Sequence, residues 1–178
     1  IHAEQAWKIT QGSPIMVAVV DTGVDYTHPD LDGNMWLNAD SWGDGIDNDL
    51  NGYIDDLYGW NFSNSLNCTS NTATPHCVKD EAGHGTHVAG IIAAEANNGI
   101  GISGIANGNV VLDTTSKVKI MAVRVTSQSG AFTSDAQVAN AITYAAENGA
   151  DIINCSFGCG APCPPNPVLE GAIREAYY

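Results

Sequence analysis

A short, almost wholly apolar run constrains the fold most strongly. Residues 15–20 include three valines and lead into Asp21-Thr22-Gly23. Such a run predicts a strand that is buried on both faces, as in a parallel sheet. Residues 117–125 and 151–156 predict two more strands. Because both faces of such a sheet must be covered, a layer of helices is expected on each side.

Helical patterns alternate with these strands. Ser134 and Gln137 form a capping box, the apolar stripe that follows has helical spacing, and Gly149 supplies a C-terminal stop. Residues 88–96 and 168–178 predict two further helices. We therefore predict a three-layer α/β domain, with a mostly parallel β-sheet flanked by helices.

The composition excludes several classes of protein. The chain has 178 residues and a formal net charge of −14. This length suits one domain, and the acidity disfavours nucleic acid as a partner. No stretch approaches the roughly 20 apolar residues of a membrane-spanning helix. The first residues form no basic and then apolar leader, so any signal peptide is expected to be absent or already removed.

The acidic residues are unevenly distributed. Ten aspartates and no lysine or arginine lie between Lys8 and Lys79. Carboxylates at this density repel one another unless a cation lies among them. Within residues 44–56, oxygen-bearing side chains alternate as in the first nine positions of an EF-hand loop, although Tyr58 stands where the closing Glu would be. We expect calcium to order this segment, the alternative being a solvated acidic loop. The expected ligands are Asp44, Asp47, Asp49, Asn51, Tyr53 and Asp55.

A second constellation pairs a carboxylate with an imidazole. Asp21 ends the first apolar run, and His84 is expected to open the first long helix, so both face the carboxyl edge of the sheet. A carboxylate that accepts from one ring nitrogen fixes the tautomer and leaves the other nitrogen as a general base. His84 and His87 also share a helix face, which keeps a metal site open as an alternative.

Longer motifs carry a resemblance to a known family. They are Asp21-Thr22-Gly23, the His-Gly-Thr-His-Val-Ala-Gly segment at 84–90, and residues 28–31, 97–101 and 153–158. These segments resemble motifs of the subtilisin-like serine proteases (subtilases). The resemblance implies a subtilisin-like fold, incomplete in this chain: residues 1–178 would be the amino-terminal portion of one catalytic domain, with an acidic insertion at about 40–60. It implies a serine endopeptidase acting on polypeptides through an Asp-His-Ser triad, in which Asp21 orients His84, and a propeptide in the precursor.

The resemblance also assigns substrate-binding positions. Residues 129–132 match the edge strand that pairs with an extended peptide, together with a pocket beside that strand. Residues 156–158 match the backbone segment on the other side of the bound peptide and one wall of the primary specificity pocket. Phe157 is bulkier than the family's usual aliphatic residue, so a changed side-chain preference is expected. The residues so assigned are Ser129, Gly130, Phe132, Ser156, Phe157 and Gly158.

Calcium is also implied by the resemblance. Asp30 and Asn98 match ligand positions of a separate calcium site in the family, whose N-terminal ligand has no counterpart here. Insertions rich in Asp, Asn and Gly, followed by a segment like residues 58–62, bind calcium in some subtilases. Calcium is therefore the expected structural cofactor at both places.

The family's nucleophile is missing from this sequence. Neither its Gly-Thr-Ser motif nor its oxyanion asparagine occurs among residues 1–178. We expect the serine to lie beyond Tyr178 and the chain alone to lack peptidase activity. Two alternatives stay open: a truncated or pseudoprotease homologue that binds peptide or calcium, and a metal-dependent hydrolase that uses His84 and His87.

The five cysteines form an odd set. Cys68 can pair with Cys77, and Cys159 with Cys163, which leaves Cys155 as a free thiol on a buried strand, although other connectivities are open. Acidity, paired cysteines and calcium together favour a secreted protein or one in a secretory-pathway compartment.

Overall fold

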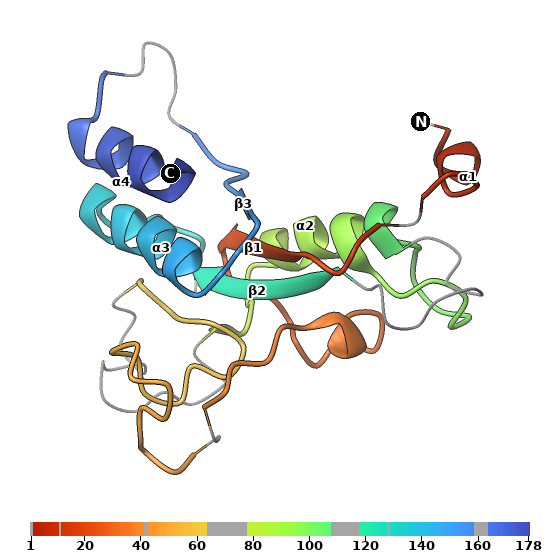
Figure 1. Cartoon of the computed structure of the whole chain (residues 1–178), viewed down its shortest axis with the longest axis horizontal. Helices are drawn as coiled ribbons and strands as arrows, with labels where there is room; N and C mark the ends of the chain where they lie inside the picture. The colour runs from red at the N-terminus through yellow and green to blue at the C-terminus, as the bar shows by residue number, and fades with distance from the viewer. Residues whose placement is uncertain are drawn as a thin grey trace.

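Three parallel strands form the centre of the computed structural model (Figure 1). They are β1 (Met16–Asp21), β2 (Lys119–Arg124) and β3 (Ile152–Asn154), in the order β2-β1-β3. Each coincides with one of the runs predicted from the sequence, and β1 extends one residue further, to Asp21. The structure describes residues 2–10, 12–40, 43–63, 78–107, 118–127, 129–158 and 164–178.

Helices cover both faces of this sheet, which confirms the predicted three-layer α/β fold. α2 (His84–Ala93) packs on one face, and α3 (Asp135–Glu147) packs on the other, with α4 (Pro167–Tyr177) against it. Shorter elements complete the described chain: α1 (Ala3–Ala6), η1 (Asp32–Asn34) and η3 (Ile105–Asn107).

The alternation of side chains along β1 explains the two layers. Val17 and Val19 join the apolar cluster on the α2 side, whereas Ala18 and Val20 join the cluster on the α3 side. All four are at most 5% exposed. A strand that carries apolar residues on both faces is stable only between two layers, because either face left in water would forfeit the free energy of its burial.

The starts of α2 and α3 follow the local sequence signals, whereas the end of α2 does not. Ser134 Oγ accepts a hydrogen bond from Gln137 N–H at 3.4 Å, so the predicted N-cap of α3 is confirmed. α2 opens at His84 as expected but ends at Ala93 rather than at residue 96. Ala94 there turns to an extended conformation, and Asn97 adopts a left-handed one (φ 61°) that a helix cannot contain.

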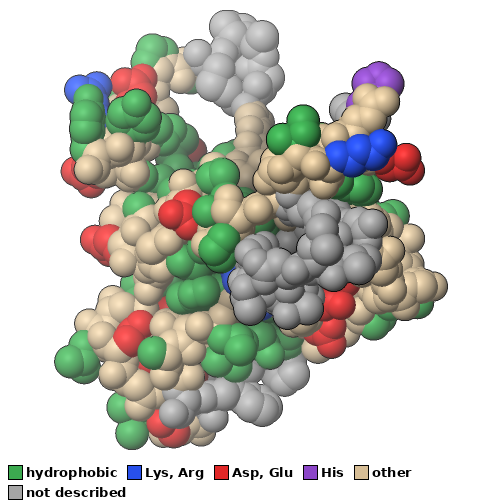
Figure 2. Space-filling view, turned by 45° about the vertical axis from the view of Figure 1, so that its right-hand side comes forward, with side chains coloured by type: hydrophobic (Ala, Val, Ile, Leu, Met, Phe, Trp, Pro, Cys, Tyr) green, Lys and Arg blue, Asp and Glu red, His purple; other side chains and the backbone are tan. Residues whose placement is uncertain are grey.

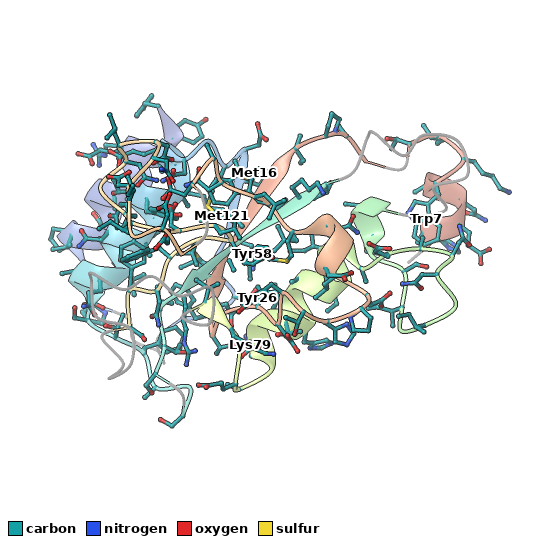
Figure 3. All side chains as sticks on the ribbon, turned by 90° about the horizontal axis from the view of Figure 1, so that it is seen from below. Trp7, Met16, Tyr26, Tyr58, Lys79 and Met121 are labelled. Carbon is teal, nitrogen blue, oxygen red and sulfur yellow. The ribbon has the colours of Figure 1, made fainter. Side chains whose placement is uncertain are left out.

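Two aromatic groups lie on opposite sides of the sheet. Tyr26 stacks on Tyr58, with ring centroids 4.5 Å apart, in the cluster on the α2 side (Figure 3). On the α3 side, Tyr53 meets the rings of Trp60, Phe62 and Tyr144 edge-on, at centroid distances of 5.1, 5.8 and 4.8 Å. The second group joins the acidic segment to α3.

The expected burial of Cys155 is wrong in this structure. Cys155 is an exposed free thiol that follows β3, and Ile152 within β3 is 50% exposed. The reason is the position of β3 at the edge of the sheet, where among the described residues it pairs with β1 alone. The other four cysteines lie outside the described residues.

The surface mixes acidic and apolar side chains. Both kinds reach solvent on the face shown in Figure 2, and on α4 the exposed apolar residues include Val168, Ile173 and Tyr177. None of the described helices is long and apolar enough to cross a membrane.

Candidate active site

Asp21 and His84 meet at the carboxyl edge of the sheet. Asp21 ends β1 and is 3% exposed, and its Oδ1 lies 2.7 Å from Nδ1 of His84, the first residue of α2. Thr22 N–H donates to the same oxygen at 2.7 Å. The His84 side chain is 54% exposed, so much of the ring is open to an incoming group. The carboxylate can therefore hold the proton on Nδ1 and leave Nε2 as the base.

Glycines let α2 approach the end of β1 this closely. A Cβ at Gly85 would lie 2.1 Å from the carbonyl oxygen of Gly23. Gly85 N–H donates to Thr22 Oγ1 at 2.8 Å, which joins the first turn of the helix to the end of the strand. Gly83 caps the helix with a φ of 91°, a left-handed conformation that favours glycine. The Gly-His-Gly sequence thus places His84 against Asp21.

A further carboxylate, Asp80, organises the turn before His84. Its Oδ1 accepts from the N–H groups of Ala82 and Gly83, and its Oδ2 accepts from both N–H and Oγ1 of Thr86, at 2.7–2.9 Å. Burial opposes its ionised form, but the hydrogen bonds from Thr86 and Gly83 hold the pKa of Asp80 below its usual value. Sequence reasoning missed this residue, although an aspartate shortly before a helix start is a recognisable capping signal.

Two basic residues anchor the segment that contains Asp80. Arg124, buried at the end of β2, donates to the carbonyl oxygen of Lys79 at 2.7 Å and pairs with Glu81 at 3.3 Å. Lys79 in turn pairs with Asp25 at 3.3 Å. Burial opposes the ionised form of Asp25, yet hydrogen bonds, from Thr27 and from Lys79, hold the pKa of this carboxyl below its usual value. The segment before His84 is therefore held both to the end of β2 and to the loop that follows β1.

The predicted peptide-pairing segment forms a short loop. Gly130 N–H donates to the carbonyl oxygen of Ser127 at 3.0 Å, and Thr126 bridges to Phe132 in antiparallel fashion. Ser129 is exposed at the tip of this loop, with its Oγ 3.0 Å from that of Ser127. Backbone next to such a tip is accessible to an extended chain.

The structure brings Phe132 and Phe157 together. Their ring centroids are 4.9 Å apart, with the planes tilted by 53°. Phe132 is 52% exposed, and the neighbours of Phe157, Ser156 and Gly158, are exposed. Both predicted substrate segments thus contribute to one aromatic surface that faces solvent.

The structure does not gather most of the ligands predicted in the acidic segment. Both oxygens of Asp47 accept backbone N–H groups, from Asn51 and Gly52, at 3.1 and 2.8 Å. Both oxygens of Asp55 likewise accept backbone N–H groups, from residues 43 and 45. Asp44 accepts from the backbone of residue 46, and Tyr53 N–H donates to the Asn51 side chain. These carboxylates order the loop through its own amides rather than converging on one point.

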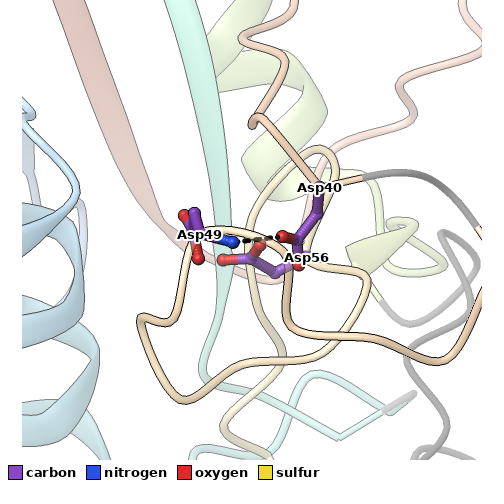
Figure 4. A group of neighbouring side chains, drawn as sticks. All are labelled: Asp40, Asp49 and Asp56. Atoms are coloured by element: carbon purple, nitrogen blue, oxygen red, sulfur yellow. Dashed lines mark hydrogen bonds between the residues drawn. The ribbon is translucent and has the colours of Figure 1, made fainter.

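Three carboxylates do converge, and only one was predicted. Asp40, Asp49 and Asp56 offer oxygens within 4.8 Å of one another (Figure 4). Asp40 lies before the alternating pattern, and Asp56 directly follows the last of its nine EF-hand-like positions, so periodicity could not select them. Asp40 is 3% exposed; its Oδ1 accepts from the N–H groups of Asn48 and Asp49, whereas its Oδ2 is buried without a hydrogen-bond partner among the described residues.

Asp56 is the most deeply embedded member of this cluster. It is 1% exposed and accepts hydrogen bonds from the side chains of Asn38, Asn51 and Tyr144. Burial raises the pKa of Asp56 to about 6, against the effect of these hydrogen bonds. Three adjacent carboxylates, one with an unpartnered buried oxygen, form the kind of hard-oxygen donor set that a divalent cation such as calcium binds.

The second predicted pair of cation ligands is brought together. Asn98 Nδ2 donates to Asp30 Oδ1 at 2.6 Å, and the backbone of Ile102 donates to Asp30 Oδ2 at 2.9 Å. Gly101 lies close to this site: a Cβ there would be 2.0 Å from that second oxygen, and its φ of 57° is a left-handed conformation that favours glycine. The buried Asp30 is thus satisfied by protein donors alone.

The helical histidine pair lacks further metal ligands in the described part of the chain. His87 is exposed on α2, one turn from His84. Among the described residues, no acidic, cysteine or histidine side chain completes a group of three with them. A His84–His87 metal site therefore gains no support from the geometry.

Comparisons with known proteins point to one family. A profile described as the subtilase family matches residues 12–176. The chain is 40% identical to "Thermitase" of Thermoactinomyces vulgaris over 177 residues, covering 99% of this chain and 48% of that protein. It is 37% identical to "Thermophilic serine proteinase" of Bacillus sp. (strain AK1), covering 99% and 33%, and 37% identical to "Halolysin" of Haloferax mediterranei, covering 89% and 24%. The chain spans less than half the length of these relatives.

The family match and the fold agree. The match covers nearly all of the chain. In the fold, the Asp-Thr-Gly segment at the end of β1 contacts the Gly-His-Gly segment at the start of α2. The chain belongs to the subtilase family of serine proteases.

Proposed function

We propose that this chain is part of a serine endopeptidase in which Asp21 and His84 act as the orienting acid and the general base. The observation that carries the proposal is the 2.7 Å contact between Asp21 Oδ1 and His84 Nδ1 at the exposed edge of the sheet. With Nδ1 protonated, Nε2 accepts the proton of a serine hydroxyl as its oxygen attacks the peptide carbonyl. The same nitrogen then donates that proton to the leaving amine, and the charge of Asp21 stabilises the imidazolium between the two steps.

The serine and the oxyanion donor come from outside residues 1–178 in this proposal. The family's Gly-Thr-Ser motif is absent from the sequence, and so is its oxyanion asparagine. The substrate is an extended polypeptide that pairs with backbone near Ser129 and Gly130 and places a side chain against Phe132 and Phe157. The contact between these two rings supports the inclusion of both in one pocket.

An organophosphate that labels activated serines tests this function. The protein as naturally produced is expected to cleave an unstructured polypeptide, to lose that activity on labelling, and to carry the label on a serine outside residues 1–178. The polypeptide of residues 1–178 alone is expected neither to cleave nor to be labelled. A label within residues 1–178, or cleavage by that polypeptide alone, would refute the proposed division of the triad.

We also propose that calcium stabilises the acidic segment. The unpartnered Oδ2 of Asp40 and its proximity to Asp49 and Asp56 support this, because a cation would satisfy that oxygen and offset the repulsion of three carboxylates. The Asp30–Asn98 pair would belong to a separate calcium site, where a cation would replace the donors that now satisfy Asp30. A secreted protein, the location we propose, meets enough calcium to fill sites of even millimolar affinity.

Thermal unfolding with and without calcium tests the cation. The midpoint is expected to be several degrees higher in millimolar calcium than in a chelator, and magnesium is expected to replace calcium poorly because it demands stricter octahedral geometry. Identical midpoints in calcium and chelator would show that the segment is a solvated acidic loop.

A further inference from the structure

Tyr144 links α3 to the acidic cluster of Asp40, Asp49 and Asp56. Tyr144 is fully buried on the sheet-facing side of α3, and its hydroxyl donates to Asp56 Oδ2. The rest of the ring packs edge-on against Tyr53 and Phe62, which fixes the direction of the hydroxyl.

A second contact ties the same end of α3 to the cluster. Asn51 Nδ2 lies 3.0 Å from Asp56 Oδ2, 3.1 Å from Asp49 Oδ2 and 3.0 Å from Oδ1 of Asn148. Asn148 is the C-cap of α3 and donates its own amide to the carbonyl oxygen of Tyr144 at 2.9 Å. The last turn of the helix therefore holds Asp56 directly through Tyr144, and Asn51 links the C-cap of the helix to Asp49 and Asp56.

This arrangement has the form of the outer shell of a metal site. Residues that hydrogen-bond to ligating carboxylates set their orientation, and their loss commonly weakens metal binding by 10–100-fold. A neutral hydroxyl is suited to the task, because it orients Asp56 without bringing a positive charge that would compete with the cation. Asp56 has a further orienting donor in Asn38.

We propose that Tyr144 is a positioning residue for a divalent cation at Asp40, Asp49 and Asp56, and that it transmits the binding of that cation to α3. The inference rests on the proposed calcium site. Cation binding then orders more than a surface loop: it holds the C-terminal half of α3, and with it the core on that face of the sheet.

Calorimetric calcium titration of the protein as naturally produced tests the proposal with two matched variants. Tyr144→Phe removes only the hydroxyl that reaches Asp56. Tyr26→Phe is the control, because Tyr26 is a buried tyrosine that packs in the apolar cluster on the opposite side of the sheet, against Tyr58. Calcium affinity is expected to fall at least tenfold in Tyr144→Phe and to stay unchanged in Tyr26→Phe.

Two further readouts separate positioning from core packing. At saturating calcium, a tenfold weaker affinity removes about 1.4 kcal/mol of calcium-dependent stabilisation, so the melting shift between chelator and calcium shrinks in Tyr144→Phe. Amides in the second half of α3 are expected to exchange more slowly in calcium than in chelator, and this difference is expected to shrink in the variant.

The outcomes distinguish this inference from the calcium proposal beneath it. If the natural protein binds calcium and Tyr144→Phe binds it equally well, only the positioning role of Tyr144 is overturned. Equal losses of melting temperature in calcium and in chelator would also overturn it, since they indicate packing alone. If the natural protein binds no calcium, both proposals are wrong.

Discussion

At the residue scale, the site depends on one carboxylate that is nearly sealed from solvent. Asp21 is 3% exposed, and only one of its oxygens has partners among the described residues: Thr22 N–H and His84. An ion held in this way acts on the histidine far more strongly than a solvated carboxylate would, because little water screens it. The tautomer of His84 is therefore set by a single contact.

Removal of that charge tests the contact. In the protein as naturally produced, Asp21→Asn is expected to lower kcat by about 10⁴-fold, because an amide in place of the carboxylate favours the wrong tautomer of His84. Asp32→Asn, which changes an exposed aspartate in η1, is expected to leave kcat within twofold. Steady-state peptide hydrolysis measures both, and equal activities in the two variants would contradict the orienting role.

Asp80 is expected to connect the stability of the turn before His84 to pH. Its pKa is lowered in the folded state, so its contribution to stability is present above the unfolded value of 3.8 and is lost as the pH falls below that value. Asp80→Asn is expected to cost about 1–3 kcal/mol at neutral pH, because an amide keeps only one acceptor oxygen, so either the donors at Ala82 and Gly83 or those at Thr86 lose their acceptor. Chemical unfolding from pH 3 to pH 7 checks this. If the loss of stability at low pH is as large in Asp80→Asn as in the wild type, that loss belongs to other groups.

At the element scale, the contact between α2 and β1 requires a glycine. Gly85→Ala is expected to destabilise the fold by about 1–3 kcal/mol and to separate His84 from Asp21, because its Cβ would lie 2.1 Å from the Gly23 carbonyl oxygen. Gly90→Ala on the same helix is the control. Its Cβ would meet only Ile102 Cδ1 at 3.8 Å, and replacing a helical glycine gains up to about 1 kcal/mol. Equal stability of the two variants would contradict the close approach.

The two loops that carry Phe132 and Phe157 are expected to set a side-chain preference together. Phe157→Leu removes one ring of the pair and opens space beside Phe132. For peptides that differ at the position facing this pocket, the ratio of kcat/KM for a large over a small side chain is expected to rise about tenfold. Tyr177→Leu, which trims an exposed aromatic residue on α4, is expected to leave the ratio unchanged. A ratio that stays constant in Phe157→Leu would place the pocket elsewhere.

The elements were predictable where a local pattern determines them. The valine-rich run gave β1, and Ser134 with Gln137 gave the start of α3, because both signals act within a few residues of the chain. The exposure of β3 was not predictable, since it depends on which strand borders it rather than on Ile152 and its neighbours. The end of α2 at Ala93 likewise depends on the turn that follows.

At the scale of the whole molecule, charge and fold are linked through the acidic segment. Six of the chain's 20 acidic residues, and no lysine or arginine, lie in this segment, which packs on α3 through the contact of Tyr53 with Tyr144. The spacing of oxygen-bearing side chains predicts a cation in this region. Most of the ligands that it selects, however, accept hydrogen bonds from the loop's own backbone amides. Asp40 and Asp56 join Asp49 only once the segment is folded, so no periodicity in the sequence could identify them.

The most direct test of His84 as the general base compares two histidines on one helix. His84→Ala and His87→Ala change neighbouring exposed side chains of α2, but only His84 contacts Asp21. In the protein as naturally produced, His84→Ala is expected to lower kcat/KM for peptide hydrolysis by about 10⁵-fold or more, and His87→Ala by less than tenfold. Retention of activity by His84→Ala, or equal losses in both variants together with inhibition of the wild type by a zinc chelator, would contradict the assignment of His84 as the general base.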